Sequence, residues 1–347
     1  MLPLLLPPNP VQHFYRGGHR IAALRGFVAE TDHQPEEWLG STLTRFGEGT
    51  VGLATTEQGE FLRDLIAAAP SEWTGGPGRD ASDTGILVKL LDAGQRLPAH
   101  VHPPREFAAS HLDCPYGKTE AWYVLDSVGD GAVYLGWREA VDRDELDRRR
   151  DAQDSEWLLD HMNRIPVTPG TGILCPAGTV HAIGEGVFVA EAQEPTDFSI
   201  LLEWSITTST RDESHLDLGF DAVMPVVSLA PLSQDDIASL TKTVDPGFSP
   251  LAPESLLPRQ ADPYFRLLRA GGGEMPSGAF PESFAVVLVT AGEGHLCSAR
   301  GSVPLRGGDA YAVPRAFGEW RIEGSAEVIA FLPGVAWPAS LGSGEIA

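Results

Sequence analysis

Two stretches of the sequence repeat the same placement of glycine and proline, and this repeat restricts the fold more than any other feature. In the first stretch Gly170 is followed after five residues by Pro176, and in the second Gly308 is followed after five residues by Pro314. Upstream of each, an apolar run leads into a turn of the form Gly-acid-Gly. A strand–turn–strand unit that occurs twice predicts two related β-barrels.

The composition agrees with a β-rich fold. The 38 glycines and 28 prolines among 347 residues fall between short apolar runs, which is typical of strands joined by tight turns. Apolar runs at 85–93, 97–102, 121–125 and 131–136 predict consecutive strands. The predicted fold class is therefore mainly β, with two barrels and a small helical insertion.

The same pattern predicts how the chain is divided. Residues 1–85 form an N-terminal segment that completes the first barrel, which itself occupies residues 86–227. Residues 141–163 interrupt that barrel as a charged helical insertion. Residues 228–260, rich in proline, serine and aspartate, form a linker, and residues 261–347 form the second barrel.

Charge and hydropathy exclude several classes of function. Asp and Glu number 48 against 25 Lys and Arg, a net charge of −23, which argues against nucleic-acid binding because phosphate backbones are neutralised by basic residues. No apolar span of ~20 residues and no basic leader occur, so we expect neither a membrane helix nor a signal peptide. Three widely spaced cysteines suggest no disulfide framework and a cytoplasmic location.

Two histidines indicate a metal site. His100 and His102 are two residues apart in an extended segment, so their imidazoles lie on one face and can share a metal. The segment from Gly94 to His102 resembles the first motif of the cupins, and the segment from Gly170 to His181 resembles the second. The resemblance implies small antiparallel barrels and one divalent metal held by three histidines and a glutamate, with His181 as the third imidazole.

The carboxylate ligand has two candidates. Glu106 lies at the spacing of the simplest cupins, within a proline-rich segment that we expect to be a loop. Glu120 immediately precedes an apolar strand, from which an inward side chain can reach the barrel interior, and it is the ligand we predict. Lys118 is two residues before Glu120 and, in an extended segment, points to the same face.

The resemblance then narrows to one family. Segments 37–41, 87–93, 100–103, 116–125 and 177–183 are similar to the class I mannose-6-phosphate isomerases, and the match covers nearly all of the chain. It implies a C-terminal cupin barrel without metal, in which Glu319 stands where a ligand histidine would fall. It also implies Zn²⁺ and the interconversion of an aldose 6-phosphate and its ketose by proton transfer between C1 and C2. The implied metal ligands are His100, His102, Glu120 and His181.

Two positions depart from the family pattern. The family has glutamine where this chain has His100, and the resulting set of three histidines and one glutamate also suits Mn, Fe, Ni or Co. The family carries an arginine shortly after the aspartate that corresponds to Asp197, whereas this chain has no arginine until Arg211. The resemblance therefore supplies no arginine for phosphate binding at this position.

These residues predict an enzyme that acts on a small sugar or sugar phosphate. Lys118, Lys89 and Asp197 are the candidates for proton transfer or for orienting the substrate. The main prediction is a metal-dependent isomerase of mannose 6-phosphate and fructose 6-phosphate. Two alternatives remain, an isomerase of an unphosphorylated sugar such as mannose and a non-catalytic sugar-binding protein with two cupin barrels.

Overall fold

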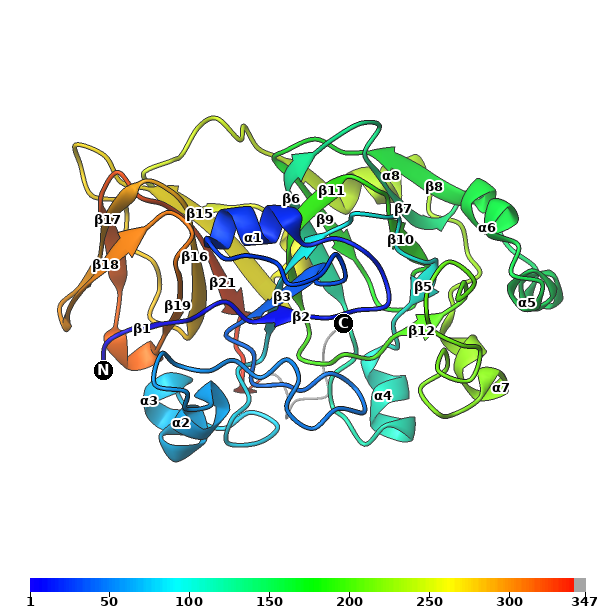
Figure 1. Ribbon diagram of the computed structural model, residues 1–347, viewed down its shortest axis with the longest axis horizontal. Coiled ribbons are helices and arrows are strands. Elements are labelled where there is room, and N and C mark those ends of the chain that lie inside the picture. Colours follow the sequence, from blue (N-terminus) through cyan, green and yellow to red (C-terminus); the bar gives the residue numbers. More distant parts are fainter. Residues whose placement is uncertain (340–347) are drawn as a thin grey trace.

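The computed structural model describes residues 1–339, and these form two β-barrels side by side (Figure 1). The N-terminal half of the chain builds most of the barrel on the right of the view, and the C-terminal part builds the barrel on the left. The predicted mainly β fold with two cupin barrels is confirmed. Residues 340–347 of the predicted second barrel lie outside the described residues.

The first barrel consists of a seven-stranded and a five-stranded sheet. The larger sheet has the order β13 (Thr241–Thr243), β9 (Thr171–Cys175), β6 (Glu120–Ser127), β11 (Val187–Gln193), β4 (Leu87–Asp92), β3 (Glu36–Leu39) and β2 (Pro10–Val11). The smaller sheet has the order β12 (Ile200–Leu201), β5 (His100–Val101), β10 (His181–Ile183), β7 (Ala132–Trp137) and β8 (Met162–Pro166). All strand pairs are antiparallel, as the resemblance to cupins implies.

The second barrel repeats this plan with fewer strands. Its larger sheet has the order β1 (Leu4–Leu5), β19 (Ala310–Val313), β16 (Ala285–Ala291), β21 (Glu327–Pro333), β15 (Phe265–Gly271) and β14 (Glu254–Ser255). Its smaller sheet has the order β18 (Gly301–Arg306), β17 (Glu293–Ser298) and β20 (Trp320–Gly324). Strand β16 pairs with β19 and β21 just as β6 pairs with β9 and β11, so the repeat seen in the sequence is a repeat of topology.

The repeated glycines explain why the pattern is visible in the sequence. Gly170 and Gly308 both have φ of +92°, a left-handed conformation that side chains rarely adopt. A Cβ at Gly170 would lie 2.3 Å from the carbonyl oxygen of Val244, and one at Gly308 would lie 2.4 Å from that of Leu24. Both turns therefore need glycine for backbone conformation and for space.

Strand alternation divides the core between the barrel interiors and the contact between barrels. Val286 and Leu288 of β16 join Val88 and Leu90 of β4 in one buried cluster that spans both large sheets. Val287, between them in sequence, belongs to a separate cluster inside the second barrel. Each buried valine or leucine contributes roughly 1.5–3 kcal/mol, so the outer faces of the two large sheets hold the barrels together.

The register shows why the second barrel cannot reproduce the metal ligands of the first. Glu120 lies opposite Cys175, and the corresponding pair in the second barrel is Ala285 opposite Val313. In the smaller sheets, β5 pairs with β10 in the first barrel, whereas in the second barrel β20 has, besides β17, an isolated antiparallel bridge between Phe280 and Trp320. The groups of side chains that could hold a metal in the described part of the chain all lie in the first barrel.

Short helices connect or cover the strands. They are α1 (His19–Arg25), α2 (Leu62–Ala68), α3 (Pro70–Trp73), α4 (Arg105–His111), α5 (Arg143–Asp151), α6 (Ser155–His161), α7 (Phe220–Val223) and α8 (Gln234–Ser239), with 3₁₀ turns at Met224–Val226, Arg259–Ala261 and Arg315–Phe317. Helices α5 and α6 form the charged insertion and project at the far right of Figure 1. None of the helices in residues 1–339 has the length and apolarity needed to cross a membrane.

The segment around Glu106 is a helix, so the expectation of a loop there was wrong. Helix α4 begins directly after Pro104, and Glu106 lies in its first turn. Proline is favoured at helix starts, and a carboxylate in the first turn interacts favourably with the positive end of the helix dipole. The side chain of Glu106 is exposed, whereas the three histidines are buried.

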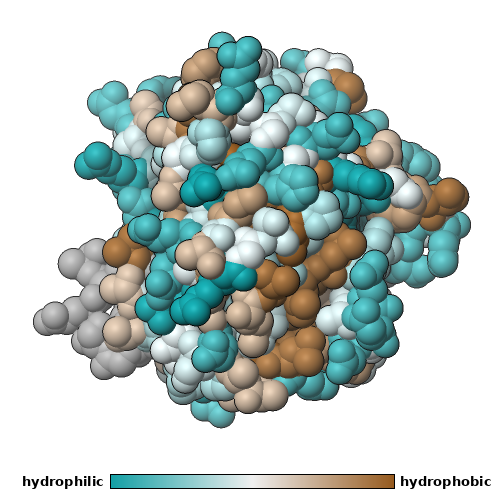
Figure 2. All heavy atoms as spheres, turned by 90° about the vertical axis from the view of Figure 1, so that its left-hand side faces the viewer, coloured by the Kyte–Doolittle hydropathy of each residue, from teal (hydrophilic) through white to brown (hydrophobic). Residues whose placement is uncertain are grey.

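Segments at the boundaries contribute to both barrels. Strands β2 and β3 of the N-terminal segment join the first barrel, but β1 pairs with β19 of the second. The predicted linker supplies β13 to the first barrel and β14 to the second. The buried Arg25 ties the N-terminal segment to both, because it pairs with Glu37 at 2.9 Å and donates to the carbonyl of Gly308. The exposed end of the second barrel mixes hydrophilic and hydrophobic residues, and its largest hydrophobic area lies right of centre in Figure 2.

Candidate active site

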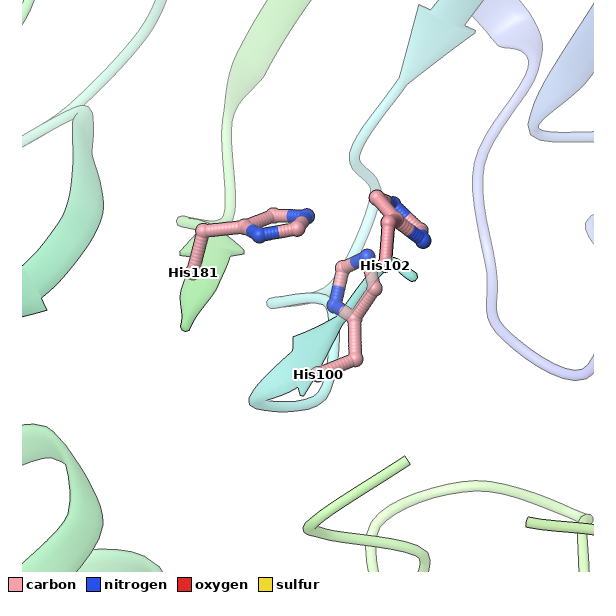
Figure 3. A group of neighbouring side chains, drawn as sticks. All are labelled: His100, His102 and His181. Atoms are coloured by element: carbon pink, nitrogen blue, oxygen red, sulfur yellow. The ribbon is translucent and has the colours of Figure 1, made fainter. Parts of the chain in front are cut away.

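Three histidines from two neighbouring strands meet inside the first barrel. His100 on β5 lies directly opposite His181 on β10, and His102 follows two residues later on the same face. The ring centroids are 4.0 Å apart for His100 and His181, 4.9 Å for His100 and His102, and 4.8 Å for His102 and His181. The rings turn toward one another (Figure 3), as the two-residue spacing and the second motif predict.

Backbone carbonyls fix the protonation of each ring. Each Nδ1 lies 2.7–2.9 Å from a carbonyl oxygen, with the pairs His100 and Pro98, His102 and Phe198, and His181 and Thr179. A carbonyl can only accept, so Nδ1 carries the proton and Nε2 presents a lone pair. Such contacts orient metal-bound histidines in many proteins. The Nε2 atoms of His102 and His181 are buried and have no hydrogen-bond partner among the described residues.

Glu120 completes this group from the other sheet. Its Oε2 lies 2.9 Å from Nε2 of His102, and its Oε1 lies 3.1 Å from Nε2 of His181. Burial alone would raise the pKa of Glu120, but His102, His181 and Lys118 more than offset this and hold it well below its usual range. Burial lowers the pKa of His102 to about 3 and that of His100 well below its ordinary value. Neutral imidazoles beside an ionised carboxylate are the donor set that a divalent cation requires.

Cys175 is a further donor that sequence reasoning did not use. It lies on β9 opposite Glu120 and is buried, and burial raises the pKa of its thiol. Its Sγ, a carboxylate oxygen of Glu120 and a ring nitrogen of His181 lie within 4.8 Å of one another. Its position immediately before Pro176 of the second motif was the available signal.

Lys118 is brought beside the candidate metal ligands. Its Nζ lies 3.7 Å from Oε2 of Glu120 and 3.4 Å from the hydroxyl of Ser199. The side chain is buried and lines a small inner cavity together with His100 and Glu120. Lysine, carboxylate and imidazole therefore face the same space, as the spacing of Lys118 and Glu120 predicts.

The opposite wall of the inner cavity combines the predicted Lys89 with residues that sequence reasoning missed. Glu36 on β3 accepts hydrogen bonds from the hydroxyl of Tyr15 at 2.5 Å and from Nε1 of Trp38 at 2.8 Å. Lys89 on β4 forms an ion pair with Glu36 at 3.1 Å and lies 4.7 Å above the ring of Trp38. His13 adds an imidazole 3.6 Å from the other oxygen of Glu36. The only signal was strand alternation, which places Glu36 and Trp38 on one face.

Lys89 and Asp197 are tied to this wall. Nζ of Lys89 lies 3.7 Å from Oδ1 of Asp197, whose other oxygen accepts from the backbone N–H of Phe46 at 3.2 Å. Burial would lower the pKa of Lys89, but Glu36 and Asp197 reverse this and raise it above its ordinary value. Lys89 therefore stays protonated, which suits a group that orients a sugar oxygen rather than a base.

Glu191 is a third buried carboxyl group on the cavity wall. It lies on β11 between Lys89 of β4 and Trp122 of β6. Burial and the negative charge of Glu120 raise its pKa well above the ordinary value, which favours the protonated form, a hydrogen-bond donor. A glutamate in the otherwise apolar run of β11 was the signal in the sequence.

The inner cavity opens into a larger outer groove. The cavity has a volume of about 40 Å³ and the groove about 600 Å³, and they share the lining residues His13, Phe14, Asp197, Ser199 and Leu201. A groove of this size suits a small molecule. A sugar would therefore lie mostly in the groove, with one end inserted toward the histidines.

The buried ion pair of Glu36 and Lys89 gives a test of this wall. We expect Glu36→Gln to lower the free energy of unfolding by about 3–5 kcal/mol, because it leaves the buried Lys89 with only the more distant Asp197. The pKa of Glu36 is lower in the folded chain than its ordinary value of 4.5, so its stabilisation is complete above that pH and is lost as the pH falls. Urea unfolding of chelator-treated protein at pH 6 and pH 4 should show a smaller pH effect in the variant.

Glu106→Gln is the matched control, because Glu106 is exposed on α4. It should unfold within about 0.5 kcal/mol of the unchanged protein. Equal stabilities of the two variants would contradict the role given to Glu36.

Fold and site together define a protein of two cupin barrels with one candidate metal centre of three histidines and a glutamate. Models of protein families give no match to the chain. Curated relatives do match: a mannose-6-phosphate isomerase of Streptococcus mutans is 28% identical over 322 residues, 90% of this chain and 93% of that protein. One of Bacillus subtilis is 28% identical over 244 residues, 70% of this chain and 73% of that protein. The predicted resemblance to the mannose-6-phosphate isomerases is confirmed.

Solved structures show the same fold. A mannose 6-phosphate isomerase from Bacillus subtilis superimposes with a TM-score of 0.71 at 22% identity, over 95% of this chain and 99% of that one. A mannose 6-phosphate isomerase bound with zinc and yttrium gives a TM-score of 0.69 at 15% identity, over 96% of this chain and 100% of that one. The likeness extends over both barrels.

Proposed function

We propose that this protein is a metal-dependent aldose–ketose isomerase that interconverts mannose 6-phosphate and fructose 6-phosphate. The observation that carries the proposal is the group of His100, His102, His181 and Glu120, which presents lone pairs and a carboxylate to the cavity beside Lys118. The curated relatives named for this reaction support the choice of substrate.

The four residues are the proposed ligands of one divalent ion. Zn²⁺ is the ion we propose, because a related structure is described as bound with zinc. Mn, Fe, Ni and Co accept the same donors. The ion supplies positive charge beside the sugar oxygens at C1 and C2, where negative charge develops as the C–H bond breaks.

The side chains of this protein divide the remaining work. Lys118, as the free amine, removes the proton from C2 of the aldose and returns it to C1. The hydroxyl proton of O2 is transferred to O1 in the same reaction, which leaves the C2 carbonyl of the ketose. Asp197 accepts a hydrogen bond from a sugar hydroxyl, and the protonated Lys89 donates one to a sugar oxygen. Glu36 and Tyr15 hold Lys89 in position.

The test of this function is turnover by the metal-loaded protein. Mannose 6-phosphate should give fructose 6-phosphate, and in heavy water the product should contain deuterium at C1. Product without any deuterium would contradict proton transfer through an exchangeable lysine. Binding of the sugar without turnover would favour the non-catalytic alternative.

The outer groove raises the question of where a phosphate would lie. Leu201 is near the position at which the family carries an arginine, and it lines both the cavity and the groove. Among residues 1–339, Arg45 is the one arginine or lysine that lines the groove, and it is held by the carbonyl of Gln12 at 2.6 Å and by Glu48 at 2.7 Å. Four carboxylates line the same groove, namely Glu48, Asp197, Glu213 and Asp217. This acidic lining favours mannose as the second candidate substrate.

Arg45 should therefore decide the affinity for the phosphorylated sugar. We expect Arg45→Gln to raise KM for mannose 6-phosphate roughly 10- to 100-fold, the effect of losing one charged hydrogen bond, with kcat changed less than about threefold. Initial rates with mannose 6-phosphate and with mannose measure both constants. An unchanged KM for the phosphate would remove Arg45, and turnover of mannose alone would select the second candidate.

We also propose a cytoplasmic location and a small sugar or sugar phosphate as the partner. The three cysteines, Cys114, Cys175 and Cys297, are free, which agrees with a reducing compartment.

A further inference from the structure

Packing of the core does not require a cysteine at position 175. The corresponding residue of the second barrel is Val313, which packs inside that barrel as an ordinary apolar side chain. A valine-sized residue therefore fills this position in the repeated fold. In the first barrel the side chain is instead a free thiol, 1% exposed, beside the candidate metal ligands.

The thiol shares its neighbours with the proposed ion. Sγ of Cys175, a carboxylate oxygen of Glu120 and a ring nitrogen of His181 lie within 4.8 Å of one another. His181 belongs both to the group with Cys175 and to the group with His100 and His102. Glu120, in the group with Cys175, also lies beside Nε2 of His181 through Oε1 and beside Nε2 of His102 through Oε2. One ion held by Glu120 and His181 would thus lie near the sulfur of Cys175 as well as near the imidazoles of His100 and His102.

We propose that Cys175 is a fifth donor to the ion held by His100, His102, Glu120 and His181. Coordination forms a metal–sulfur bond and releases the thiol proton to solvent. Imidazole and carboxylate donors select poorly among divalent metals, whereas a thiolate favours soft and borderline ions such as Cd²⁺ and Zn²⁺ over Mn²⁺. Cys175 therefore gives this centre a preference for thiophilic ions that the other four ligands do not supply. The proposal rests on the metal centre and not on the identity of the sugar.

The first test is spectroscopic and does not depend on turnover. The protein loaded with one equivalent of Co²⁺ should show a sulfur-to-cobalt charge-transfer band in the near ultraviolet. Cys175→Ser should lose that band, whereas Cys114→Ser and Cys297→Ser, at the other two free cysteines, should keep it. One bound equivalent of Co²⁺ without the band in the unchanged protein overturns the role of Cys175 and leaves the metal centre standing.

The second test measures selectivity. In competition titrations, Cys175→Ser should weaken Cd²⁺ binding about tenfold or more relative to Mn²⁺ binding. Cys175→Val, which copies the second barrel, guards against a folding defect of the serine variant and should give the same change. An unchanged ratio of the two affinities in folded variants overturns the proposal, and failure of the unchanged protein to bind any ion overturns the metal centre with it.

Discussion

Replacing Lys118 by methionine is expected to lower kcat by ~10²–10⁴-fold, the usual cost of losing a general base. Methionine keeps an unbranched side chain of similar length, so the buried position beside Glu120 and Ser199 remains filled. Metal content should stay at one equivalent, because Lys118 is not among the proposed ligands. Steady-state kinetics and elemental analysis of the same preparation give both quantities.

Exchange of the substrate C2 proton with solvent distinguishes a catalytic base at Lys118 from a lysine that only supports the structure. The variant should also lose deuterium exchange at C2 of the aldose, in step with turnover. Lys242→Met is a control, because Lys242 lies on β13 at the edge of the seven-stranded sheet. Its kcat should stay within about threefold of that of the unchanged protein. A Lys118→Met protein with the original rate would remove this lysine from the mechanism.

Replacing His181 by alanine should abolish metal binding. The substitution removes one of the donors and leaves Glu120 with a single imidazole contact, that of His102. We expect the dialysed variant to hold only a small fraction of one equivalent, and turnover to fall by ~10²-fold or more, because the charge at the developing oxyanion is lost. Elemental analysis and kinetics measure the two effects.

The matched comparison uses residues of the same type elsewhere. His111→Ala, at the exposed end of α4, should keep its metal. Glu120→Gln should lose metal and Glu106→Gln should retain it. The opposite result for the two glutamates would mean that the carboxylate ligand had been chosen wrongly.

The residues that could be predicted from the sequence are those fixed by local geometry. His100 and His102 share a face because they are two residues apart in an extended segment, and the turn geometry at Gly170 marks the second motif. Glu120 and Lys118 follow from the start of β6. In each case the residues that define the pattern are only a few positions apart, so the pattern can be recognised in the sequence before the fold is known.

The opposite wall of the cavity could not be predicted in this way. Glu36 reaches Lys89 only because β3 pairs with β4, and their separation in the sequence carries no periodic signal. His13 and Tyr15 arrive from a segment without regular structure. Glu191 was accessible in principle, since a glutamate within an apolar strand needs a buried partner, but which partner depends on the neighbouring strands.

The pairing of β1 with β19 has a consequence for the order in which the molecule is made. Leu4 and Leu5 leave the ribosome long before their partners, Ala312 and Tyr311. The hydrogen bond from Arg25 to the carbonyl of Gly308 likewise forms only after Gly308 has been made. The metal-binding barrel can assemble earlier, as N-terminal domains do during synthesis. Strands β2 and β3 hold the stretch with His13 and Tyr15 to the first barrel, so this wall of the cavity can form together with the candidate metal ligands. The contacts of the N-terminal segment with the second barrel form only after residues 308–312 have been made.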